Sequence, residues 1–235
     1  MGYLTDSYSC QVNKGTHKAI NRFRKLSWAV SANNTKICWV LKCDIRKFFA
    51  NIDHQVLKDI LWKYIEDENI LWLLGTIIDS FCTGSQKGVG LPLGNVTSQL
   101  LINVYMNEFD QFVKRDLKVK YYIRYCDDFV VLHRDKSYLE NLIPQVSYFL
   151  SGELKLSLHS DKVFIKKLSS GMDFLGWIHF PHHRVLRTAT KRRMFKRIKY
   201  NNSKETIASY LGLLKHGNTH KLIQRIRNKV KAEAD

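Results

Sequence analysis

Hydrophobic residues recur along this chain at two different periods, which predicts a mixture of strands and helices. Residues 37–43 form an apolar run of strand character that ends at Asp44. Asp53 then has the position of a helix N-cap, because apolar residues follow it at helical spacing as far as residue 65. A second apolar helix is predicted over 70–81. Three glycines mark the loop that comes after it, at positions 84, 88 and 90.

The second half of the chain shows the same mixture. Two apolar runs, 121–123 and 129–132, flank a short tetrapeptide and predict a hairpin. The other predicted elements are helices over 95–117, 136–150, 191–200 and 204–215, and short strands near 163–167 and 172–180. Because hairpins occur without strict alternation of strand and helix, we predict an α+β fold, with a helical tail that stands apart.

Composition places the chain among folded globular proteins, at 45% hydrophobic and 12% aromatic residues. No apolar stretch approaches the roughly 20 residues that cross a bilayer, and the N-terminus lacks the pattern of a signal peptide. The five cysteines are odd in number and show no CxxC spacing, which favours reduced thiols. We therefore expect a cytoplasmic protein without a membrane partner.

Charge changes this picture more than any other property of the composition. The formal net charge is +17, and residues 184–235 contain 15 Lys and Arg against 3 Asp and Glu, so that stretch alone carries +12. A basic block at helical spacing is typical of a surface that binds a polyanion such as nucleic acid. The alternatives are a merely solvated face or a patch for anionic membranes.

The tetrapeptide Tyr125-Cys126-Asp127-Asp128 is the strongest candidate for chemistry. We expect Asp127-Asp128 to be the two-residue turn of the hairpin, and an ordinary turn explains this pair as well as a catalytic role does. If the strand ending at Asp44 lies beside it, three carboxylates meet at one end of a sheet. They would repel one another unless cations neutralised them. Two Mg²⁺ ions held there could clamp the attacking and leaving oxygens of a phosphoryl transfer.

Four ordered segments resemble the motifs of reverse transcriptases. Residues 40–49 resemble the first catalytic motif, 125–128 the YxDD box, 90–99 the motif between them, and 173–177 the hairpin that grips the primer. The resemblance runs from about Asp6 to the C-terminus. It implies a right-hand polymerase, with a fingers remnant over 1–36, a palm with a mainly antiparallel sheet over 37–180, and a basic helical thumb over 181–235.

The resemblance also implies roles for the acidic residues. Asp44 and Asp127 would bind two Mg²⁺ ions, for which Mn²⁺ could substitute, and Asp128 would assist them. The carbonyl of Ile45 would complete a metal shell. Lys162 matches the lysine that protonates the leaving pyrophosphate, and a surface role is its alternative.

Four further residues would contact the incoming dNTP. Phe49 matches the aromatic gate that excludes a 2′-hydroxyl, and a plain core phenylalanine is the alternative. Leu93, Gly94 and Gln99 lie in the middle motif, where most reverse transcriptases have Gln-Gly and Ser-Pro. The variant Leu93-Gly94 and Ser98-Gln99 is similar to the enzymes of diversity-generating retroelements, which copy adenines with frequent errors.

Template RNA and a cDNA primer are the implied partners, together with a small basic accessory protein. Arg124 would contact phosphate or template, with a structural salt bridge as its alternative. Trp177 would lie near the primer end, with core packing as its alternative. The thumb residues Lys191, Arg192 and Arg193 would bind the duplex.

Three alternatives stay open at this point. The middle motif could also belong to the reverse transcriptase of a group II intron or a retron. The family normally has a longer fingers segment before the position of Asp6, so we expect that segment to be missing from this chain. A non-catalytic RNA-binding palm would then be the remaining interpretation.

Overall fold

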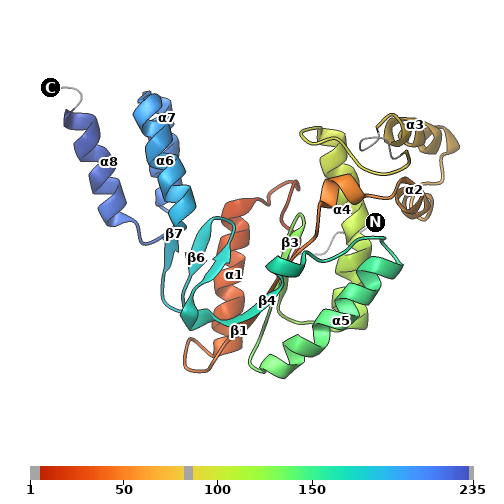
Figure 1. Cartoon of the computed structure of the whole chain (residues 1–235), viewed down its shortest axis with the longest axis horizontal. Helices are drawn as coiled ribbons and strands as arrows, with labels where there is room; N and C mark the ends of the chain where they lie inside the picture. The colour runs from red at the N-terminus through yellow and green to blue at the C-terminus, as the bar shows by residue number, and fades with distance from the viewer. Residues whose placement is uncertain (1–5, 82–86, 233–235) are drawn as a thin grey trace. The chain divides into compact units, whose positions relative to one another are not determined.

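The computed structural model describes residues 6–81 and 87–232, with side chains described up to residue 228. The chain forms two compact units (Figure 1). The first unit comprises Met1–Leu26 and Trp39–Ile165, and the second comprises Ser27–Cys38 and Lys166–Asp235. These units differ from the predicted domains, because residues 1–26 belong to the same unit as the central sheet and the boundary falls after residue 165 rather than 180.

The first unit is built on a four-stranded sheet with the order β2-β3-β1-β4. Its strands are β1 (Trp39–Asp44), β2 (Tyr122–Tyr125), β3 (Asp128–His133) and β4 (Phe164–Lys167), whose last two residues fall in the second unit. Strand β3 pairs antiparallel with both β2 and β1. The pairing confirms the predicted hairpin and brings the end of the early strand β1 beside the start of β3.

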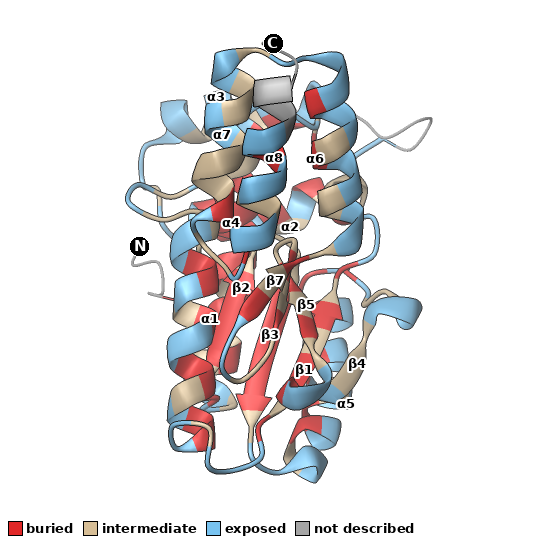
Figure 2. Ribbon diagram, turned by 90° about the vertical axis from the view of Figure 1, so that its left-hand side faces the viewer, coloured by how far each residue is buried: buried red, intermediate tan, exposed pale blue. Residues whose placement is uncertain are grey.

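Helices of the first unit share one hydrophobic core with this sheet. They are α2 (His54–Trp62), α3 (Glu68–Asp79), α4 (Val96–Gln111) and α5 (Lys136–Gly152), and α4 continues as a π-helical turn, Phe112–Asp116. Buried residues of β1 and β3 share one hydrophobic cluster with α2, α4 and α5, and the burial of the strands is visible in Figure 2. Phe109 of α4 lies within that cluster, with its ring centroid 5.0 Å from that of Phe129.

Acidic residues cap several of these helices, and the cap at Asp53 is the one that the sequence predicts. The Asp53 carboxylate accepts the amide of Val56 at 3.0 Å, which satisfies a donor that the helix leaves unpaired. Asp67 caps α3 in the same way, so this helix begins two residues before the predicted position. The loop position Gly84 lies outside the described residues. Helix α1 (Thr16–Ser31) begins directly after Gly15.

The second unit pairs a small antiparallel sheet with three helices. The sheet has the order β5-β6-β7, and its strands are Met172–Phe174, Trp177–His179 and Arg184–Leu186. The helices are α6 (Thr188–Tyr200), α7 (Lys204–Leu214) and α8 (His220–Ala232). Leu175 and Gly176 join β5 to β6 with φ values of 53° and 83°, the positive pair that a type I′ hairpin turn requires.

Short 3₁₀ turns complete the fold at Phe48–Asn51, Ser160–Lys162 and Leu168–Ser170. Across the described residues, no helix has the length and apolar character that crossing a membrane requires. The mixture of helices with antiparallel strands confirms the predicted α+β class.

Candidate active site

The turn between β2 and β3 is one residue earlier than the sequence predicts. Tyr125 pairs with Asp128, so the turn residues are Cys126 and Asp127, and Asp128 is the first residue of β3. Cys126 has a φ of 59°, a left-handed conformation that costs free energy in a residue other than glycine. The prediction of an Asp127-Asp128 turn was wrong because the ladder continues to Asp128.

The pairing of β1 with β3 brings the acidic residues to one end of the sheet. Asp44 and Asp128 are direct cross-strand partners, and the amide of Ile45 donates to the carbonyl of Asp127 at 3.3 Å. Because side chains alternate along a strand, Lys42 and Asp44 lie on the same face as Asp128. That face is opposite to the one on which Leu41 and Cys43 join the core cluster.

Two lysines balance the charge of these carboxylates. Lys42 Nζ lies 3.0 Å from Asp128 Oδ2, and Lys162 Nζ lies 3.0 Å from Asp44 Oδ1. Burial raises the pKa of Asp128 to about 6, and Lys42 opposes that rise. Burial also raises the pKa of Asp127, and the nearby Asp44 adds to the effect. The acidic group at the turn is therefore costly to ionise without additional positive charge.

The donor set fits a hard divalent cation such as Mg²⁺, which prefers carboxylate oxygens and retains water or phosphate ligands. Asp128 Oδ1 is buried and has no hydrogen-bond partner among the described residues. Among the described residues, at this site and everywhere else, no three or more His, Cys, Asp or Glu side chains lie close enough together to hold a metal ion without further ligands. Substrate oxygens would therefore have to complete any ion shell at this site.

The predicted nucleotide contacts come from segments that hydrogen bonds fix to the core. Phe49 is half-buried in the turn that follows β1, and its carbonyl accepts the amide of Leu91 at 2.8 Å. Leu93, two residues after Leu91, is 77% exposed to solvent. Gly94 has a φ of 91° and open space where a side chain would stand. Gln99 is half-buried in the first turn of α4.

Arg124 has a structural environment, which corrects its prediction as a nucleic-acid contact. Its side chain is fully buried and pairs with Asp110, whose Oδ2 lies 2.5 Å from Nη2. It also donates to Ser7 Oγ at 3.0 Å and to the carbonyl of Cys126 at 2.9 Å. A buried charge needs such partners, so Arg124 cannot reach a phosphate in this structure. It instead fixes the β2–β3 turn through its hydrogen bond to the carbonyl of Cys126.

Trp177 is likewise buried, at 1% exposure, which corrects its prediction as a primer contact. Its indole packs against Gly217, where an added Cβ would overlap the ring. The guanidinium of Arg184 lies 5.8 Å from the ring centroid. Trp177 therefore packs in the core of the second unit, which is the alternative that the sequence left open.

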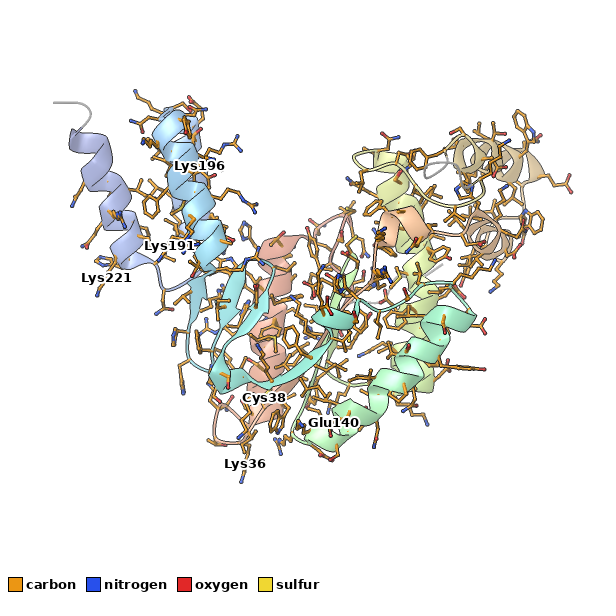
Figure 3. The ribbon with its side chains drawn as sticks, viewed as in Figure 1. Lys36, Cys38, Glu140, Lys191, Lys196 and Lys221 are labelled. Atoms are coloured by element: carbon orange, nitrogen blue, oxygen red, sulfur yellow. The ribbon has the colours of Figure 1, made fainter. Side chains whose placement is uncertain are left out.

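The basic residues of the predicted thumb lie on α6. Arg192 and Arg193 are exposed, and Lys191 is half-exposed. Figure 3 marks Lys191 and Lys196 on this helix and Lys221 on α8. Their part in binding nucleic acid stays a prediction.

Sequence reasoning missed the residues that support the acidic turn. Lys42 stands two residues before Asp44, a spacing that puts both on one face of a strand. Asp110 is a carboxylate among apolar positions of a helix, which signals a buried partner. Ser7 left no sequence signal, because its contact with Arg124 spans 117 residues.

An antiparallel hairpin packed against helices, with Asp44 and Asp128 paired across neighbouring strands and Asp127 in the β2–β3 turn, defines a polymerase-like palm. The family described as reverse transcriptase (RNA-dependent DNA polymerase) matches residues 5–179, and the chain belongs to this family.

Several known proteins resemble the chain in sequence. It is 28% identical to Protein YkfC of Escherichia coli (strain K12) over 254 residues, covering 90% of this chain and 64% of that protein. It is 23% identical to the group II intron-encoded protein LtrA of Lactococcus lactis subsp. cremoris over 225 residues, covering 67% of this chain and 37% of LtrA. The chain thus spans less than two thirds of the length of these relatives.

The fold also resembles solved polymerase structures. Apo telomerase from Candida tropicalis, truncated from its C-terminal domain, matches with a TM-score of 0.60 at 13% identity, over 77% of this chain and 41% of that one. At this identity the likeness concerns the fold alone, and it agrees with the predicted α+β polymerase architecture.

Proposed function

We propose that this chain carries out RNA-templated DNA synthesis, in which a primer 3′-hydroxyl attacks the α-phosphate of a dNTP. The observation that carries the proposal is the cross-strand pair of Asp44 and Asp128 beside the Asp127 turn. Burial raises the pKa values of Asp127 and Asp128, so divalent cations that bridge them to phosphates would offset the cost of ionising these two carboxylates.

In this proposal Asp44 and Asp127 hold two Mg²⁺ ions, or Mn²⁺ ions, with Asp128 and the Ile45 carbonyl assisting. When bound, such ions stabilise the charge on the attacking and leaving oxygens. Lys162 supplies the proton for the leaving pyrophosphate. Its contact with Asp44 raises the pKa of the ammonium, so the proton stays on Nζ until phosphate approaches.

The proposed dNTP pocket uses Phe49 to exclude a ribose 2′-hydroxyl, with Gly94 and Gln99 beside it. Leu93 would face the new base pair. An aliphatic side chain there offers no hydrogen bond to test the base, and sites without such polar groups discriminate weakly. We therefore infer error-prone synthesis, as in diversity-generating retroelements, with a small basic accessory protein as a further partner and the cytoplasm as its location.

A second candidate is the reverse transcriptase of a group II intron or a retron. The similarity to LtrA, a group II intron-encoded protein, favours the intron form. The two candidates share the reaction and differ in the template. Genomic context separates them, because a template repeat beside a variable gene marks one and intron sequence marks the other.

Primer extension tests the shared reaction. The chain would be given a primed RNA template, dNTPs and Mg²⁺, and Asp127→Ala would be compared with Asp116→Ala, an exposed aspartate away from the turn. We expect Asp127→Ala to lower extension by about 10²–10³-fold, the usual loss when transition-state charge is left without stabilisation. Asp116→Ala should behave as the unmodified chain does. Extension that does not depend on Asp127 would leave the RNA-binding palm as the better interpretation.

A further inference from the structure

An open groove lies between α2 and α3 of the first unit. It measures about 720 Å³. The residues that define it include Lys58, Leu61, Trp62, Leu71, Trp72 and Asp79. The residues from α2 recur at helical spacing and turn one face of that helix towards α3.

Two tryptophans at this groove are largely exposed to solvent. Trp62 is 62% exposed and Trp72 is 72% exposed, and Ile70 nearby is 48% exposed. Large apolar side chains gathered in one exposed patch are uncommon on a monomer and mark interaction sites. Tryptophan is also the residue most enriched among the contacts that dominate binding energy.

The groove is acidic, although the chain as a whole is strongly basic. Residues 58–79 contain five acidic residues and two lysines, a net charge of −3 in a chain of net charge +17. The charged residues that line the groove itself are Lys58, Glu66, Glu68 and Asp79, a net charge of −2. Both lysines are engaged, since Lys58 lies 2.6 Å from Asp79 and Lys63 lies 3.6 Å from Glu108. Glu66 and Glu68 line the groove and form no ion pair with any residue that the structure describes.

This combination excludes several occupants. A nucleic-acid backbone or an anionic membrane would be repelled by the glutamates. The basic helix α8 of a second copy is also unsuited, because Ile226 on its apolar face is buried within its own unit at 1% exposure. What the surface complements is a segment with apolar anchors and positive charges.

We propose that the α2–α3 groove docks a basic amphipathic helix of a partner protein. Apolar residues one turn apart on that helix would lie between the two indoles, as in other helix-in-groove complexes. Its lysines or arginines would face Glu66 and Glu68 and could also stack over the tryptophan rings. At physiological salt the Debye length is about 8 Å, so the glutamates that line the groove dominate the potential that a docked helix would meet.

A defined peptide tests the proposal. A fluorescein-labelled 18-residue helical peptide, with leucines one turn apart and lysines around them, would be titrated with the full chain and followed by anisotropy. The same peptide with every lysine replaced by glutamate is the matched probe. We expect saturable binding of the lysine peptide that Trp72→Ala weakens. Any binding of the glutamate peptide to the basic stretch from residue 184 onwards should be insensitive to Trp72→Ala.

Variants of the chain then locate the site. Trp72→Ala should weaken binding by about tenfold or more, as at interface hot spots. Glu66→Gln with Glu68→Gln should weaken it by about two- to fivefold, as for exposed charge pairs. Leu73→Ala is the control, because Leu73 is 52% exposed on α3 but does not line the groove. All of these side chains are exposed, so circular dichroism should be unchanged.

Three results would overturn the proposal. They are the absence of saturable binding by the lysine peptide, binding of the glutamate peptide that Trp72→Ala weakens equally, and binding of the lysine peptide that is insensitive to Trp72→Ala. Dimerisation of the chain in sedimentation that Trp72→Ala abolishes would also overturn it, since the occupant would then be a second copy.

Discussion

Burial of Asp128 couples the stability of this fold to pH. Its pKa lies at about 6 rather than near 3.8, so the folded protein keeps this proton to a higher pH than the unfolded chain does. The contribution of protonated Asp128 to the free energy of unfolding is therefore complete below about pH 4, and it is lost as the pH rises through about 6. At 1.36 kcal/mol per pKa unit, ionising Asp128 costs roughly 2–3 kcal/mol by pH 7.

We predict that Asp128→Asn removes this dependence. Without added metal, the difference in unfolding free energy between Asp128→Asn and the unmodified chain should grow in favour of the variant by roughly 2–3 kcal/mol between pH 4 and 7. Urea unfolding at a series of pH values measures it, with Asp116→Asn as the exposed control. Parallel curves for all three proteins would show that Asp128 ionises without cost.

Leu93 offers a second prediction at this scale, because 77% of it is exposed and its substitution should not disturb the fold. Leu93→Gln restores a hydrogen-bonding group beside the proposed base pair. We expect it to lower misincorporation at template adenines by about two- to tenfold, the range that one hydrogen bond supports.

Sequencing of cDNA made on a defined RNA template measures this effect. Leu100→Gln, at an exposed position further along α4, is the matched control and should leave the error rate unchanged. An unchanged error rate in Leu93→Gln would sink the assignment of this side chain to fidelity.

At the scale of elements, sequence patterns predicted the strands and helices better than the contacts between them. The period of apolar residues and the N-cap Asp53 located β1 and α2 correctly, because both signals are local. The turn residue Cys126 was missed, since nothing in the tetrapeptide specifies that Asp128 continues the ladder. The burial of Arg124 could not be predicted either, because it depends on Asp110 and Ser7, which only the tertiary fold brings to it.

Trp177 shows how a glycine in one element permits the packing of another. Gly217 leaves space that the indole fills, so Gly217→Ala should force the ring to move. We expect a loss of about 1–3 kcal/mol in the stability of the second unit, the usual cost of overpacking.

The matched control for this change is Gly212→Ala. Gly212 lies inside α7 with nothing within 4 Å of an added Cβ, so alanine there should stabilise the helix by about 0.5–1 kcal/mol. Urea unfolding, followed by the fluorescence of tryptophan, measures both variants. Equal effects of the same sign would contradict the packing assigned to Trp177.

At the scale of the whole molecule, charge is divided along the chain in a way that suits the proposed substrates. The stretch from residue 184 onwards carries +12, whereas the β2–β3 turn and the α2–α3 groove are acidic. A basic surface holds phosphates without reading sequence, and an acidic turn repels them until cations intervene. The two compact units therefore carry complementary parts of one proposed reaction, one that binds the polyanion and one that acts on it.

This division predicts a salt dependence that follows α6. Binding of a primed RNA template should weaken as salt increases, with the slope of log K against log salt set by the number of phosphate contacts. Removing the exposed pair with Arg192→Gln and Arg193→Gln should reduce that slope by up to about 1.4–1.8, at roughly 0.7–0.9 for each contact.

Fluorescence anisotropy at four or more salt concentrations measures this slope. Lys136→Gln is the control, since Lys136 pairs with Glu140 on α5 of the first unit at 2.6 Å. If the double variant keeps the original slope while Lys136→Gln lowers it, the duplex lies on the first unit and α6 is a solvated face.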